Sequence, residues 1–292
     1  MLGVMKLRDG EALPATPLVI ACGKGGVGRS SAAMALAHAY AARGERVALV
    51  HPADAPPVHP LQGLATPDVI ALDGTKALHT YLDAQLPGPL ASALRASRVF
   101  GLITAATPGL SELLTIGELQ RLLEADYERV VFDAPATGHL LAMFDAPGRF
   151  ERAAAVGPIA ARARNLGDWI ADPAHVACVA VTTGDGLAVS ELVDLAAALR
   201  ERTGHEPALV IANRLAPASP PAAELEGLPA VAADAGVAAA ADLVLALAAR
   251  GRSERAQLGR ITKATGHQPL RVVEEPGDAV AAITTALAGS LS

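Results

Sequence analysis

The 292-residue chain has a net charge of −6, and 51% of its residues are hydrophobic although only 3% are aromatic. This acidic balance argues against a general nucleic-acid binder, which needs a basic face. No apolar run approaches the roughly 20 residues that span a bilayer, so we expect no integral membrane segment. We see no secretory signal at the N-terminus, and both cysteines lie in apolar strand-like runs. We therefore expect a cytoplasmic chain without a disulfide framework.

The first predicted element, after a lead-in of residues 1–16, is a short apolar strand that begins at Pro17 and runs into a glycine-rich turn. From Gly23 to Ser30 the sequence fits the phosphate-binding pattern G-x-x-x-x-G-K-[ST] except at Arg29, where the pattern has lysine. Glycines let a phosphate approach the backbone N–H groups, and the helix expected over 31–43 presents its positive N-terminal end. The turn therefore predicts a phosphate site at which Ser30 supplies a hydroxyl for magnesium.

The same glycines also satisfy the weaker dinucleotide pattern G-x-G-x-x-G, through Gly23, Gly25 and Gly28. That pattern requires an acidic residue about 20 positions later, at the end of the second strand, to hold a ribose hydroxyl. His51 stands there instead, after a strand expected over 46–50. A nicotinamide-linked oxidoreductase is therefore a disfavoured alternative, and a purely structural glycine turn is another.

The next segment, residues 51–60, is rich in proline and is expected to be a loop beside the phosphate site. Strands are then expected over 68–72, 99–104 and 129–133, and helices over 75–86, 90–96 and 110–126. Asp133 ends the last of these strands. A carboxylate at the end of a strand next to a phosphate loop can hold the magnesium shell, although an aspartate that only caps the following turn is the alternative.

The second half of the chain alternates in the same way. Helices are expected over 150–170, with a break at Gly157 and Pro158, and over 188–202, 237–250, 252–265 and 279–287. Strands are expected over 175–181, 208–214 and 269–273. This order predicts an α/β fold with a doubly wound, mostly parallel sheet and helices on both faces. We expect a single domain over 17–292, with a short helical insertion or arm around 145–172.

Four segments together resemble the family of arsenite-transporter ATPases (ArsA), which also contains the ATPase that guides tail-anchored proteins to membranes. GKGGVGRS (23–30) is similar to the family's deviant phosphate loop, and HPAD (51–54) stands in the place of its first switch. FDAPATGHLL (132–141) resembles its second switch and is the most specific of the four, and VIANR (210–214) is similar to the strand end that faces adenine. The resemblance covers most of the chain and implies a P-loop NTPase fold.

The resemblance implies that the loop binds ATP or ADP together with Mg²⁺. Lys24 would reach across a dimer interface to the partner's nucleotide. Ser30 would coordinate the magnesium ion. The loop residues that would bind the cofactor are Gly23, Gly25, Gly26, Val27, Gly28, Arg29, Ser30 and Ser31.

The other motifs imply the rest of the nucleotide site. Asp133 would belong to the metal shell, and Gly138 would donate its N–H near the γ-phosphate. Asn213, with Arg214 beside it, would bind adenine. Because no N-K-x-D sequence follows that strand, ATP is favoured over GTP.

Two departures from the family pattern fall on positions that carry chemistry. Arg29 keeps the charge of the lysine that bridges the β- and γ-phosphates, but its planar fork demands a different geometry. His51 replaces the aspartate that positions the attacking water. A neutral imidazole can orient water, so His51 could take this role; the alternative is that His51 is a loop residue without a role. Asp54, three residues later, is not assumed to take over. Lys24, Arg29, His51 and Asp54 are the candidate catalytic residues.

Two hypotheses follow. The first is an ArsA-like ATP-binding protein that dimerises around nucleotide and hydrolyses ATP slowly. The second is a hydrolysis-impaired, nucleotide-gated subunit that pairs with a competent ArsA-like paralogue. No cysteine cluster for a metalloid is present, and four methionines are few for a Met-rich client groove. The choice between homodimer and heterodimer, and any protein client, stay open.

Overall fold

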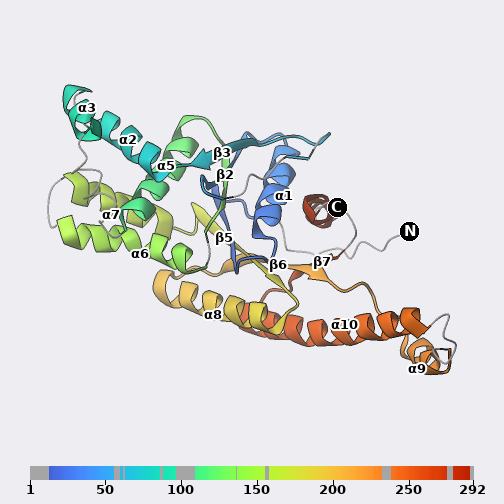
Figure 1. Cartoon of the computed structure of the whole chain (residues 1–292). Coiled ribbons are helices and arrows are strands. Elements are labelled where there is room, and N and C mark those ends of the chain that lie inside the picture. The colour runs from blue at the N-terminus through green and yellow to red at the C-terminus, as the bar shows by residue number, and fades with distance from the viewer. Residues whose placement is uncertain are drawn as a thin grey trace.

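The computed structural model describes residues 13–55, 60–61, 63–85, 88–96, 109–135, 137–154, 158–231, 238–274 and 279–289. Seven strands form one all-parallel sheet in the order β3-β2-β4-β1-β5-β6-β7. This arrangement confirms the predicted doubly wound parallel sheet, with β1 at its centre (Figure 1). The strands are β1 (Leu18–Gly23), β2 (Val47–Pro52), β3 (Asp68–Leu72), β4 (Arg129–Asp133), β5 (Val176–Thr183), β6 (Pro207–Leu215) and β7 (Leu270–Val273).

Helices cover both faces of this sheet (Figure 1). They are α1 (Arg29–Ala41), α2 (Gly74–Gln85), α3 (Gly88–Ala96), α5 (Leu110–Ala125), α6 (Thr137–Ala154), α7 (Pro158–Ala171), α8 (Gly186–Thr203), α9 (Ala222–Val231), α10 (Ala238–Thr265) and α11 (Ala279–Gly289). Within the described residues, none of these helices is long and apolar enough to cross a membrane.

Alternate residues of β1 enter two separate cores, because successive side chains of a strand point to opposite faces of the sheet. Leu18, Ile20 and Cys22 pack in a core with α5, α6, α7, α8 and α10. Val19 and Ala21 pack in the other core, with α1 and α11. Burial on both faces explains why this strand reads as an unbroken apolar run.

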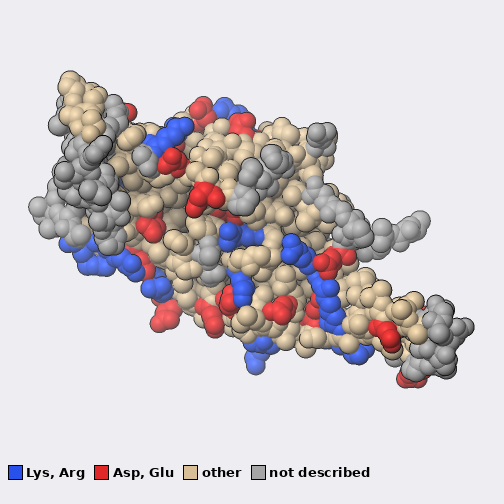
Figure 2. Space-filling model, viewed as in Figure 1, with Lys and Arg blue, Asp and Glu red and all other residues tan. Residues whose placement is uncertain are grey.

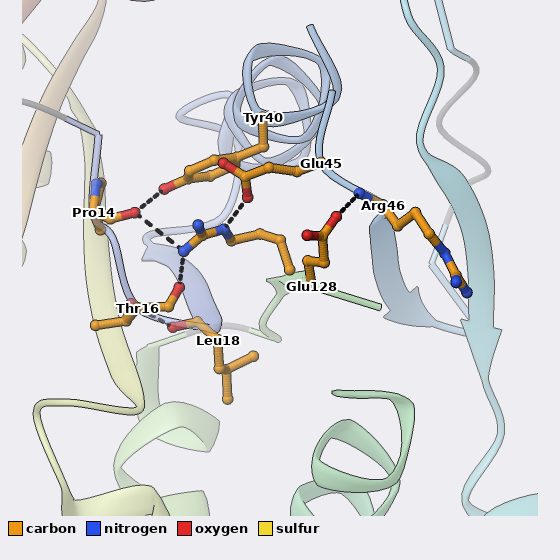
Figure 3. A network of polar contacts seen from close by, with 8 residues as sticks. Pro14, Thr16, Leu18, Tyr40, Glu45, Arg46 and Glu128 are labelled. Carbon is orange, nitrogen blue, oxygen red and sulfur yellow. Dashed lines mark hydrogen bonds and ion pairs between the residues drawn. The ribbon is translucent and has the colours of Figure 1, made fainter. Parts of the chain in front are cut away.

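Arg129, the first residue of β4, stabilises the amino-terminal edge of the sheet. Figure 3 shows its partners Thr16 and Glu45 and the neighbouring Tyr40. Arg129 Nε donates to Glu45 Oε2 at 2.7 Å, and its Nη1 donates to the carbonyl oxygen of Thr16. The guanidinium also lies 4.4 Å from the centre of the Tyr40 ring, whose hydroxyl donates to Pro14 O at 2.7 Å. These contacts hold the chain before β1 in place at the end of the sheet opposite Asp133.

Three sequence expectations need correction. His51 lies inside β2 and not in the loop after it, because the parallel pairing with β3 continues to Pro52. The two helices expected over 237–250 and 252–265 are one helix, α10. Gly251 does not break this helix, because one glycine in a helix interior costs only about 1 kcal/mol relative to alanine. Helix α6 begins at Thr137, well before residue 150. The strand expected over 99–104 lies outside the described residues.

Candidate functional site

The site is built where β1 and β4 end side by side. Ala21 of β1 is the register partner of Asp133 of β4, so the glycine loop that begins at Gly23 starts at the same edge of the sheet as this carboxylate. The backbone of Gly23 has φ 151°, and a side chain there would overlap the carbonyl oxygen of Val181 on β5. Glycine is therefore required for the chain to leave β1 and enter the loop.

Arg29 connects the loop to Asp133. It is the first residue of α1, and its Nε donates to Asp133 Oδ1 at 2.8 Å while its Nη1 donates to Gly23 O at 3.2 Å. The Asp133 side chain is 3% exposed and that of Arg29 is 18% exposed. A buried carboxylate and a guanidinium therefore form a charge-assisted ion pair directly under the loop.

Asn213 and Arg214, at the carboxyl end of β6, contact the tip of the loop. The Asn213 side chain is buried; its Nδ2 donates to Val27 O at 3.0 Å, and its Oδ1 accepts from the Arg214 N–H at 2.9 Å. Arg214 Nη1 donates to Gly26 O at 3.1 Å. A side chain at Gly28 would overlap Asn213 Nδ2, so the loop and the end of β6 are in close contact.

Lys24 is held within its own chain. Its Nζ lies 2.7 Å from Oε1 of Glu191, which stands on α8. Both side chains are partly exposed, at 33% and 40%. Glu191 was not predicted as a site residue, because a single glutamate on a helix with no motif around it carries no signal for this contact.

Comparisons with known proteins found similarity to ATPases over about half of the chain. No family model matches the chain. ATPase GET3C of Arabidopsis thaliana is 27% identical over 163 residues, which cover 44% of this chain and 41% of the relative. ATPase BagA of Mycobacterium tuberculosis (strain H37Rv) is 32% identical over 176 residues, which cover 51% of each protein.

These curated relatives are ArsA/GET3-type ATPases, and the chain is similar to them at low identity and over part of its length. It spans about half the length of the curated relatives that it matches, 41% and 51% in these two cases. The all-parallel sheet, with a glycine loop between β1 and α1, is the P-loop NTPase arrangement that this relationship implies.

The two residues that the resemblance assigns to the first switch, His51 and Asp54, lie in β2 and just after it, and β4 separates β2 from β1 in the sheet. His51 is buried in β2, with its Nδ1 2.9 Å from Pro52 O. Asp54 is exposed and lines a cavity of about 310 Å³ together with Phe132 of β4 and His139 of α6. Within the described residues, neither His51 nor Asp54 makes a hydrogen bond or ion pair with the glycine loop.

Gly138, Ser30 and Ser31 all lie in the first turn of a helix. Gly138 is the second residue of α6 and is exposed, and the two serines follow Arg29 at the start of α1. The first four N–H groups of a helix have no partner within that helix. Gly138 therefore lies in the first turn of the helix that follows β4, where its N–H has no acceptor within that helix.

A second ionic cluster, which was not predicted from the sequence, contacts the backbone of Arg214. Glu254 of α10 is 6% exposed and accepts from Arg250 Nε and from the Ala216 N–H, both at 2.8 Å. Arg250 also donates to Glu274 Oε2 at 2.9 Å and to the carbonyl oxygen of Arg214 at 2.5 Å. Hydrogen bonds to Glu274 and Glu254 raise the pKa of Arg250. The spacing of Arg250 and Glu254, i and i+4 on one helix, was the available signal.

No reactive thiol stands beside the loop. Cys22 is fully buried in β1, and burial raises the pKa of its thiol to about 12, against the opposing effect of the Arg29 charge. Cys178 of β5 is also buried and unpaired. Both side chains therefore act as small apolar core residues.

The residues of the loop fit a triphosphate with magnesium. A Cβ added at Gly25 or Gly26 would meet nothing within 4 Å, so the loop is open where a phosphate would approach. Within the described residues no cluster of three or more His, Cys, Asp and Glu side chains could hold a metal by itself. One carboxylate, Asp133, with the Ser30 hydroxyl and phosphate oxygens is the donor set that Mg²⁺ commonly uses.

Proposed function

We propose that this chain binds ATP with Mg²⁺ at the loop from Gly23 to Ser31 and acts as a nucleotide-dependent dimeric switch with slow ATP hydrolysis. The observation that carries the proposal is the meeting of the glycine loop and the buried Asp133 at one edge of the sheet, through Arg29 at 2.8 Å. The similarity to ATPase GET3C and ATPase BagA supports it.

Different groups of the chain would bind the phosphates and the magnesium ion. The N–H groups from Gly25 to Ser30 and the positive end of α1 would bind the phosphates. Asp133 and Ser30 would hold Mg²⁺, which neutralises charge on the β- and γ-phosphate oxygens when it is bound. The Arg29 guanidinium would pair with phosphate oxygens as a planar fork.

The adenine would lie beside Asn213 and Arg214, because β6 is two strands from β1 on the side away from Asp133. Asn213 already uses one N–H on Val27 O and offers its second N–H as a donor. In the proposed reaction His51 would orient the attacking water. Asp54, which follows β2, is the other candidate catalytic side chain of this segment.

Calorimetric titration of the purified chain with ATP in the presence of Mg²⁺ tests the proposal. We expect saturable binding that Gly28→Ala weakens at least tenfold, because the added Cβ collides with Asn213 in a left-handed backbone conformation of φ 92°. Gly227→Ala, in an open position on α9, is the matched control and should bind as the unmodified chain does. Absence of Mg²⁺-dependent ATP binding to the unmodified chain would contradict the proposal.

A second candidate function is a nucleotide-gated partner subunit with little hydrolysis of its own. Two nitrogens of Arg29 are engaged with Asp133 and Gly23, and Nδ1 of His51 is engaged with a backbone carbonyl, so the chain itself partly occupies both side chains that depart from the family pattern. Phosphate release should then be near background for the chain alone and should rise for Arg29→Lys or with a competent paralogue. Robust turnover by the unmodified chain alone excludes this candidate.

A further inference from the structure

Two cations of the loop, Lys24 and Arg29, and one that contacts it from β6, Arg214, differ in how their charge is balanced. Lys24 pairs with Glu191 in a partly exposed contact. Arg214 takes part in no ion pair within the described part of the chain, and its Nη1 donates to a carbonyl oxygen. Arg29 pairs with Asp133, whose side chain is only 3% exposed. Arg29 and Asp133 are therefore the buried ion pair of the site.

Separating this pair has an electrostatic consequence. Removal of one partner from a buried ion pair leaves a buried charge without compensation, which is strongly unfavourable. If Arg29 moves to the phosphates of a nucleotide, Asp133 is left as an unpaired carboxylate next to a polyanion. A divalent cation that binds Asp133 and the phosphate oxygens at the same time removes this repulsion.

We propose that the ion pair between Arg29 and Asp133 makes nucleotide binding depend on a divalent cation, through an exchange of partners. Without metal, Arg29 stays on Asp133 and on Gly23 O, and a nucleotide is held by the loop N–H groups and α1 alone. With metal, Asp133 transfers to the cation and Arg29 becomes free for the phosphates. This inference rests on the ATP binding proposed above and assigns Arg29 and Asp133 as the residues that set its metal dependence.

The test measures the ATP dissociation constant by calorimetry in Mg²⁺ and in EDTA, and takes the ratio of the EDTA value to the Mg²⁺ value. For the unmodified chain we expect a ratio of about thirty or more. Asp133→Asn should reduce the ratio at least tenfold, because Arg29 is then free to bind metal-free ATP while the carboxylate ligand of the metal is lost. Arg29→Met should increase it severalfold, since Asp133 then repels metal-free ATP and accepts the cation without competition.

The control is Asp126→Asn, which breaks the exposed ion pair between Asp126 and Arg46 on the surface and should leave the ratio unchanged. Circular dichroism and thermal unfolding establish that each variant is folded. If a variant does not fold, the unmodified chain still provides a test. A ratio of its EDTA to Mg²⁺ dissociation constants near one overturns the inference.

The failures of the two proposals are distinguishable. If ATP binds and neither variant changes the ratio, the exchange of partners is wrong and the nucleotide site stands. If ATP binds in neither Mg²⁺ nor EDTA, the proposed function itself fails. A ratio that moves in the same direction in Asp133→Asn and Arg29→Met also overturns the exchange, because the two residues must act in opposite senses.

Discussion

At the scale of single residues, the end of β6 stores a strained conformation that its neighbours maintain. Arg214 has φ 54°, in the left-handed region that residues with a side chain adopt at a cost of about 1 kcal/mol or more. Its N–H is bound by Asn213, its carbonyl by Arg250 and its guanidinium by Gly26 O. Such strain persists where the surroundings fix it, and here it directs Arg214 toward the glycine loop.

Asn213 is the residue on which this arrangement depends, and Asn213→Ala should reveal it. The change leaves Val27 O and the Arg214 N–H without partners, so the free energy of unfolding should fall by about 1–3 kcal/mol. Urea denaturation measures this loss. Asn165→Ala, at an exposed position of α7, is the control and should change the stability by less than about 0.5 kcal/mol. Equal stabilities of the two variants would show that Asn213 does not fasten the loop.

His205, between α8 and β6, should make the stability depend on pH. Its side chain is buried against the ring of Phe144, with centroids 5.1 Å apart. Burial lowers the pKa of His205 below 6.5, although contacts with the Ile170 and Ala171 backbone and the charge of Asp172 act in the opposite direction. The unfolded chain then binds more protons than the folded chain, so this stabilisation is complete above pH 6.5 and is lost as the pH falls from 6.5 toward the folded pKa.

Urea unfolding at pH 7.5 and pH 5.5 tests this sign. The loss of stability between the two pH values should be smaller in His205→Gln than in the unmodified chain. His267→Gln, at a half-buried position after α10, controls for the removal of a histidine as such. A loss that is as large in His205→Gln as in the unmodified chain would assign the pH dependence to other groups.

At the scale of elements, α1 does more than begin the phosphate site, because it also anchors part of the chain between β2 and β3. His38 on α1 is 1% exposed; its Nδ1 lies 2.8 Å from Ala65 O, and its Nε2 lies 3.0 Å from the Leu61 nitrogen. A neutral ring with its proton on Nδ1 donates to Ala65 and accepts from Leu61. This one side chain therefore joins the helix after the loop to residues beyond the first switch.

Replacement of this side chain should loosen that connection locally. His38→Phe keeps an aromatic ring but leaves the Leu61 N–H without its acceptor, so hydrogen exchange at the Leu61 amide should accelerate at least tenfold. Exchange measured by nuclear magnetic resonance checks this. The amide of Leu49, in the interior of β2, is the internal control and should keep its protection. Unchanged exchange at Leu61 would mean that other contacts hold this segment.

The sequence predicted the secondary structure best for strands that are buried on both faces. It predicted least well the boundaries and contacts that depend on tertiary packing. The strands β1 and β4 are apolar runs that end in Gly23 and Asp133, so both their positions and their meeting at one edge were predictable. The continuation of β2 through His51 depends on its pairing with β3, and the continuity of α10 across Gly251 depends on buried residues on both sides of it, such as Ala248 and Leu258. Glu191 could not be assigned to the site, since its partner Lys24 is remote in sequence. The i,i+4 spacing of Arg250 and Glu254 predicts their ion pair, but not the hydrogen bond from the remote Ala216 N–H.

At the scale of the whole molecule, charge is distributed without a large area of one sign on the face shown in Figure 2, where Lys and Arg are interspersed with Asp and Glu. Many of the basic side chains are already paired on the surface, as Arg164 is with Glu151 and Arg200 with Glu206. A surface of this kind gives little long-range attraction to a polyanion. The charges of this face (Figure 2) therefore add little to the attraction between a nucleotide and the loop.

The proposed dimer requires Lys24 to leave its own chain, and its partner Glu191 opposes this step. The pair is partly exposed, so its separation costs about 0.2–1 kcal/mol. Glu191→Gln should consequently shift ATP-dependent dimerisation toward the dimer by a few-fold in the dissociation constant, as measured by analytical ultracentrifugation with ATP and Mg²⁺. Glu206→Gln breaks an exposed ion pair with Arg200 near the end of α8 and should have no effect. Lys24→Met should reduce the dimer population, and if it dimerises as well as Glu191→Gln does, Lys24 makes no contact across the interface.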